Sequence, residues 1–221
     1  MRSSRTCNVK VSAYNHSDSE NRYVYEKQQY VVWWNLYRLA EALSVVSPNF
    51  EKLESVLIKY RELHNEFYTK LMGKKLRLIN AQATDLPLID DWLSLMLKYQ
   101  MDFTYSWRKI SLGNEGISAL KTMYNLGDDF NIWYNNWQSR LIQQNLPMNT
   151  VYQIMQTSNP AIILRNSFLQ EAISKAQNGD YSEVEYLFNA ISYPYQEIPQ
   201  YSKYYSVPPS SSEDIELSCS S

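Results

Sequence analysis

Glycine is scarce in this sequence. Only five occur in 221 residues, at positions 73, 113, 116, 127 and 179. With these spacings neither G-x-G-x-x-G nor G-x-x-x-x-G-K-[ST] can be written, and the kinase motifs H-R-D-x-x-x-x-N and D-F-G are also missing. Because such loops hold phosphates through closely approaching backbone N–H groups, we expect no phosphate-binding loop in this chain.

Cysteine and histidine are also scarce, with two of each: Cys7, Cys219, His16 and His64. Two cysteines near opposite ends of a long chain do not make a secreted disulfide framework, and they favour a reducing compartment. A zinc site needs three or four converging nitrogen or sulfur ligands, which this set does not supply. We expect His64 to be a helix-flank histidine with ordinary hydrogen bonds.

The run Asn15-His16-Ser17-Asp18 contains the residue types of a catalytic triad. Triads are spatial, however, and three successive residues cannot fold back onto one another in that geometry. Asn, Ser and Asp are common in turns, where their side chains bind nearby backbone groups. We therefore interpret this run as a turn.

Charge and hydropathy exclude two classes of partner. The chain has 21 basic and 23 acidic residues, and no basic cluster larger than Lys74-Lys75-x-Arg77, so nucleic-acid binding is not expected. Its longest apolar stretch, residues 30–46, contains polar and charged residues, so we expect a soluble helix and no membrane partner. We expect no signal peptide, because the N-terminus has no apolar core segment, although the first 17 residues lack acids and weakly resemble a mitochondrial transit peptide. The expected location is cytoplasmic, or mitochondrial in a eukaryote.

Apolar residues recur at helical spacing along most of the chain, which predicts an all-α fold. We expect one helical domain over residues 30–192, an irregular lead-in over 1–29 and an extended tail over 193–221. Asn49 is a predicted N-cap, Gly73 a predicted stop, and residues 113–116 a predicted loop. Helices are expected at Phe50–Met72, Asp85–Met101, Asp102–Ile110, Asp128–Gln144, Pro160–Asn178 and Ser182–Ile191.

The aromatic and acidic pairs have simple structural interpretations. The pairs Trp33-Trp34 and Trp133-x-x-x-Trp137 are expected to be core aromatics. Asp90-Asp91 and Asp128-Asp129 lie near predicted helix starts, where negative charge is favourable.

Several stretches resemble one known family when they are taken together. They are YNHSDSENRYVYEKQQYVVWWNLYRLAEAL, DFTYSWRKIS and SNPAIILRNSFLQEAISKAQNGDYSEVEYLFNAISYPY, followed by VPP…IELSCSS. The chain resembles the selenoprotein O/YdiU family over about residues 14–221, and Met1–Ala13 does not match. The positions that carry the resemblance are Asn15, His16, Ser17, Asp18, Arg22, Trp34, Asn35, Arg38, Asn159, Pro160, Arg165 and Asn166.

The resemblance implies a protein-kinase-like fold that transfers AMP from ATP to Ser, Thr or Tyr hydroxyls of proteins, with Mg²⁺ or Mn²⁺. In the family the nucleotide, metal and catalytic residues precede N-H-S-D, so the chain resembles the helical C-terminal part alone. It would then contain no catalytic, ATP-binding or metal-binding residue and be inactive by itself. Its implied partners are the missing N-terminal kinase-like half and protein substrates. The alternatives are a stand-alone helical interaction module, or one half of a split enzyme.

The family resemblance also concerns the thiols. Cys219 matches a C-terminal thiol that pairs in the family with a cysteine preceding N-H-S-D, but Tyr14 occupies that position here. Cys7 is a substitute partner, and a free, exposed Cys219 is the alternative. Helices that pack on the missing half would expose apolar surface, so we also expect self-association of the isolated chain.

Overall fold

The fold was analysed in a computed structural model that describes residues 22, 24, 27–46 and 49–207. Over these residues every regular element is a helix and no strand occurs, which confirms the all-α prediction. Within the same residues, no helix is long and apolar enough to cross a membrane. Most of the predicted lead-in, Cys7 and Cys219 lie outside the described residues.

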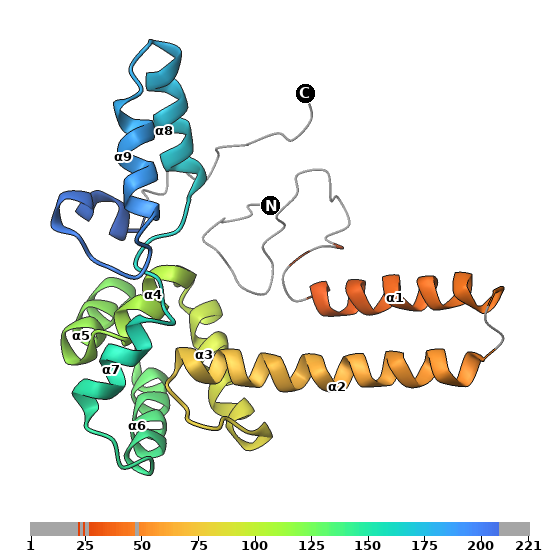
Figure 1. The fold of residues 1–221 in the computed structure, drawn as a ribbon. Coiled ribbons are helices and arrows are strands. Elements are labelled where there is room, and N and C mark those ends of the chain that lie inside the picture. The colour runs from red at the N-terminus through yellow and green to blue at the C-terminus, as the bar shows by residue number, and fades with distance from the viewer. Residues whose placement is uncertain (1–21, 23, 25–26, 47–48, 208–221) are drawn as a thin grey trace.

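The helices form a body with two projecting hairpins (Figure 1). One hairpin consists of α1 and the first part of α2, and the other consists of α8 and α9. The body contains the end of α2 and helices α3 to α7. The helix bounds are α1 Gln28–Ser44, α2 Phe50–Lys75, α3 Leu86–Lys98, α4 Phe103–Ile110, α5 Gly113–Tyr124, α6 Asp128–Ile142, α7 Met148–Gln156, α8 Asn166–Gln177 and α9 Ser182–Ile191, with 3₁₀ turns at Ala83–Asp85 and Pro199–Tyr205.

Stacked indoles form the centre of the body. The rings of Trp92 and Trp133 lie 4.5 Å apart, and those of Trp133 and Trp137 lie 5.5 Å apart. Trp133 and Trp137 are buried, and their ring N–H groups donate to the carbonyls of Leu88 and Leu76. Buried indoles contribute large apolar area once that N–H finds an acceptor. The prediction of core aromatics is confirmed for this pair, whereas the α1 tryptophans are only half-buried.

A smaller core holds α8 and α9 together. It contains Leu187 and Ala190 from α9, packed with Tyr201 and Tyr204 from the 3₁₀ turn Pro199–Tyr205. The prediction of an extended segment after residue 192 was wrong over this turn, because the two tyrosines bury their rings against the hairpin.

Burial raises the pKa of Glu183, but hydrogen bonds from lysine and tyrosine side chains outweigh it and lower that pKa to about 2.

Three glycines correct the predicted boundaries. Helix α2 does not stop at Gly73, where a Cβ would lie 2.3 Å from the Cβ of Ala81. Residues 113–116 are not a loop but the first turn of α5. There Gly113 has a left-handed φ of 65°, and a Cβ on Gly116 would lie 1.9 Å from the Lys109 carbonyl oxygen. These glycines permit close backbone approach inside or beside helices, so they do not act as stops.

The predicted helix start at Asn159-Pro160 was also wrong. Helix α8 begins at Asn166, and an unpredicted helix, α7, precedes the linker of residues 157–165. The Asn159 side chain is fully buried and binds the end of α2 instead of capping a following helix. A tertiary contact therefore replaced the local capping interaction that the dipeptide suggested.

Candidate functional site

The family-motif residues fall into two groups in the described structure. Asn15, His16, Ser17 and Asp18 lie outside the described residues. Around α1, the Arg22 guanidinium lies 4.5 Å from the centre of the Trp34 ring, and that of Arg38 lies 5.2 Å from it. Asn35 is exposed on the same helix. The second group, Asn159, Pro160, Arg165 and Asn166, occupies the α7–α8 linker and the first residue of α8.

The linker binds α4 through an ion pair. Arg165 donates from Nη1 to Oδ2 of Asp102 at 2.7 Å and from Nη2 to Oδ1 at 2.9 Å. The side chains are 14% and 3% exposed, respectively. Oδ1 of Asp102 also accepts from the Tyr105 N–H at 2.8 Å and so caps α4. A guanidinium that makes two hydrogen bonds to one carboxylate fixes both the distance between the two groups and their relative orientation.

Arg108, which lies on α4, binds the same linker. Arg108 is buried, and its Nη1 donates to the carbonyls of Gln156 and Asn159, both at 3.2 Å. Its Nε donates to Glu197 at 3.2 Å, beyond the α8–α9 hairpin. One side chain thus connects α4 to three separate points of the chain.

Lys75, the last residue of α2, completes this cluster. Its ammonium donates to Oδ1 of Asn159 at 3.1 Å and lies 5.1 Å from the centre of the Trp107 ring. The Asn159 side-chain amide in turn donates to the Lys75 carbonyl at 2.9 Å. Burial lowers the pKa of Lys75 to about 8, because the charged form loses its water.

We call Lys75, Asp102, Arg108, Asn159 and Arg165 the interhelix joint. It ties the end of α2 and helix α4 to the linker that leads to α8. Its cations bind carbonyls and carboxylates of this same chain, at positions where the chain would otherwise leave buried polar groups unpaired. Chemically, the arrangement is suited to holding helices together.

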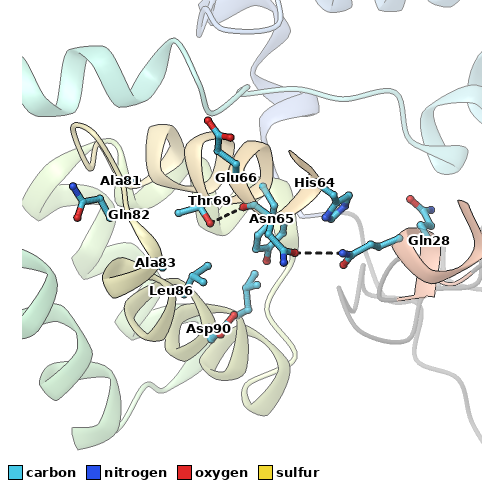
Figure 2. Close-up of a pocket in the computed structure, with 13 residues that line it drawn as sticks. Gln28, His64, Asn65, Glu66, Thr69, Ala81, Gln82, Ala83, Leu86 and Asp90 are labelled. Carbon is cyan, nitrogen blue, oxygen red and sulfur yellow. Dashed lines mark hydrogen bonds between the residues drawn. The ribbon is translucent and has the colours of Figure 1, made fainter. Parts of the chain in front are cut away.

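An open pocket of about 990 Å³ lies elsewhere, between the start of α1, the second half of α2 and the start of α3 (Figure 2). Across it, Gln29 Nε2 donates to Asn65 Oδ1 at 3.3 Å. Glu66 and Asp90 contribute carboxylates, and none of the described residues lining it is Lys or Arg. Amide and carboxylate walls suit an amine or amide ligand better than a phosphate.

His64 lies at this pocket. Its ring stacks at 6.3 Å on Tyr68, and its Nδ1 is buried without a hydrogen-bond partner among the described residues. The expected ordinary hydrogen bonding therefore does not hold for this nitrogen. No group of three or more His, Cys, Asp or Glu residues in the described part of the chain could hold a metal ion.

Sequence reasoning missed both the joint and the pocket as sites. It singled out Asn159 and Arg165 through the family pattern, but nothing local indicates that they meet Lys75 and Asp102. The pocket residues Asn65 and Asp90 belong to no motif, and Asp90 lies in the fifth position of α3 as an exposed side chain rather than at a helix end.

The chain resembles known proteins over most of its length. The sequence model of the family described as protein adenylyltransferase SelO matches residues 9–192. The match therefore begins before residue 14, where the sequence analysis placed it.

Relatives named protein nucleotidyltransferase YdiU occur in bacteria. The Erwinia tasmaniensis protein is 34% identical over 210 residues, covering 94% of this chain and 43% of the relative. The Geobacillus kaustophilus protein is 35% identical over 208 residues, covering 91% and 42%. The chain thus spans about two fifths of the length of these relatives. On these matches, the chain belongs to the SelO family of protein adenylyltransferases.

Proposed function

We propose that this chain is the helical C-terminal part of a protein adenylyltransferase that transfers AMP from ATP to Ser, Thr or Tyr hydroxyls of proteins. In this proposal the chain holds neither the nucleotide nor the Mg²⁺ or Mn²⁺ ion, and it is inactive alone. Its role is to provide a helical scaffold for the remaining, kinase-like part of the enzyme.

The interhelix joint carries the proposal. Arg108 and Arg165 stand in the sequence blocks that define the family, and they are the cations a phosphate site would use. Both are instead bound within the chain, to carbonyls and to the Asp102 carboxylate. A cation held in this way supports helix packing, and its release to a phosphate would leave a buried carboxylate unpaired.

The extent of the match supports the same role. More than half of each bacterial relative has no counterpart in this chain. The glycine-poor sequence contains neither G-x-G-x-x-G nor G-x-x-x-x-G-K-[ST], and the described pocket has carboxylates and no lining Lys or Arg. These observations support the proposal that the ATP and metal ligands lie in the part that the relatives have in addition.

The test is an AMP-transfer assay on the purified chain. The chain is incubated with α-labelled ATP, Mg²⁺ or Mn²⁺ and a general protein acceptor, beside the intact Erwinia tasmaniensis relative. We expect label on the acceptor with the relative and none above background with the chain. Transfer by the chain alone, at a rate that follows its concentration, refutes the proposed inactivity.

A stand-alone interaction module is the second candidate. It is favoured by the large exposed side chains on α1 and α2 and by the open amide-lined pocket. A neighbouring reading frame that encodes the kinase-like part would support a split enzyme. Its absence, together with stable expression of this chain, would support the independent module.

A further inference from the structure

Helix α1 carries an apolar stripe that lies to one side of its contact with α2. The stripe consists of Val32, Leu36, Leu39 and Leu43, separated by 4, 3 and 4 residues. This spacing keeps side chains on one face of a helix and is the spacing of a helix–helix seam. Leu36 is half-buried and the other three are exposed.

Helix α2 repeats the pattern. Val56, Tyr60, Leu63 and Phe67 have the same separations of 4, 3 and 4 residues. Three of them are exposed, Phe67 by 57% and Val56 by 60%. Most of this second stripe is therefore not buried by the described chain.

The two stripes lie on the same side of the α1–α2 hairpin. Helix α1 faces α2 with Trp33 and the buried Ala40, and α2 faces α1 with the buried Leu57 and Arg61. At 3.6 residues per turn, each stripe is rotated from that contact by roughly 80–110° in the same sense. Because the helices run antiparallel (Figure 1), equal rotations bring both stripes to one side of the pair. We call this surface the hairpin face.

The hairpin face belongs to neither hydrophobic core of the described structure. The buried part of the main core takes residues from α2 only from Met72 onward and none from α1, and the second core lies in the α8–α9 hairpin. Two helices form one layer, and a layer with an apolar side is stable when a second layer covers it. Within the described residues, the hairpin face is therefore an apolar side of a layer that no second layer covers.

We propose that the hairpin face is the docking surface for the part of the family polypeptide that has no counterpart in this chain. The inference rests on the proposed function and locates the contact that it requires. In the bacterial relatives that part is more than half of the protein. In those relatives it is present in the same molecule, at high effective concentration, whereas a second copy would compete only by free encounter.

The test uses co-expression. This chain is produced with the unmatched part of the Erwinia tasmaniensis relative, which carries an affinity tag. The relative's own matched part, expressed in the same way, is the positive control for a competent tagged partner. Hydrogen exchange of the purified complex then locates the contact. We expect co-purification, with protection of residues 28–46 and 50–71 relative to the free chain.

Matched variants separate the hairpin face from general apolar exposure. Replacing Leu39, Leu63 and Phe67 by Gln keeps helix propensity and removes the apolar stripe. The control replaces Ile132, Ile142 and Phe188 by Gln, which are as exposed but lie on α6 and α9 or at their ends. We expect the first set to weaken the complex about tenfold or more and the control set to leave it unchanged.

Three outcomes overturn the docking surface: no complex where the relative's own part forms one, equal loss with both variant sets, or exchange protection away from α1 and α2. A homodimer of this chain that the tagged partner does not displace, and that the first variant set abolishes, would assign the hairpin face to a second copy instead. AMP transfer is measured on the same samples. If the complex forms through the hairpin face but transfers no AMP, only the adenylyltransferase role is refuted. If the complex transfers AMP and the hairpin-face substitutions do not weaken it, only the docking surface is refuted.

Discussion

Removing the guanidinium of Arg165 should strongly destabilise the protein. The substitution Arg165→Met keeps an unbranched apolar chain of similar length in the linker. It deletes both hydrogen bonds to Asp102, at 2.7 and 2.9 Å. The Asp102 carboxylate then loses its ion-pair partner in a site where its side chain is 3% exposed, and among the described residues the Tyr105 N–H is its remaining donor.

The cost follows from that burial. Breaking a buried ion pair from one side costs about 3–5 kcal/mol, because the other charge stays desolvated and unpaired. The retained Tyr105 N–H and the partial exposure of Arg165 favour the lower end, so we expect a loss of about 3 kcal/mol. That is a large part of the roughly 5–15 kcal/mol that stabilises a typical protein.

Asp102→Asn in the same background tests the cause. The amide oxygen still caps α4, but the unpaired charge is gone, so the double variant should regain part of the lost free energy. Lys70→Gln is the control, because Lys70 pairs with Glu66 on the surface of α2, where such a pair contributes about 0.3–0.5 kcal/mol.

Urea unfolding, followed by far-ultraviolet circular dichroism and tryptophan fluorescence, measures these differences. A loss below about 1 kcal/mol for Arg165→Met would show that the interhelix joint is not energetically important. A double variant no more stable than Arg165→Met would refute the explanation by an unpaired buried charge.

Two further predictions concern the α8–α9 hairpin and the α4–α5 contact. Because the folded-state pKa of Glu183, about 2, lies below its ordinary value of 4.5, its stabilising effect is present above about pH 4.5 and is lost as the pH falls from there toward 2. Urea midpoints of the wild type should therefore fall more steeply over this range than those of Glu183→Gln, and parallel curves would contradict the assignment. Gly116→Ala should cost about 1–3 kcal/mol or more in urea unfolding, since its Cβ would meet the Lys109 carbonyl, whereas Ser118→Ala on the exposed side of the same helix should be nearly neutral; equal effects would exclude the clash.

Short-range signals in the sequence predicted much of the helical structure. The side chain of the predicted N-cap Asn49 accepts from the Lys52 N–H, as residues of this type do at helix starts. The spacing of Trp133 and Trp137 correctly predicted a buried face of α6. Each of these features depends on residues within about one turn of one another, so a local pattern contains the whole interaction.

Long-range contacts explain where the predictions failed. Asn159-Pro160 has the local form of a helix start, yet the Asn159 side chain binds Lys75, 84 residues earlier in the chain. Gly116 belongs inside a helix because the backbone of Lys109 approaches it closely. Tyr201 and Tyr204 follow a proline-rich stretch, but burial against α9 orders them into a 3₁₀ turn.

The sequence by itself determined that the described chain is helical, where several of its helices begin, and to which family it belongs. Only the tertiary structure decided that Arg108 and Arg165 are bound within the chain, and which side of the α1–α2 hairpin stays uncovered. The physical reason is the separation along the sequence between the residues that interact. Capping and helical periodicity act over three or four residues, whereas the pairing of Asp102 with Arg165 spans 63 residues and depends on how the helices pack.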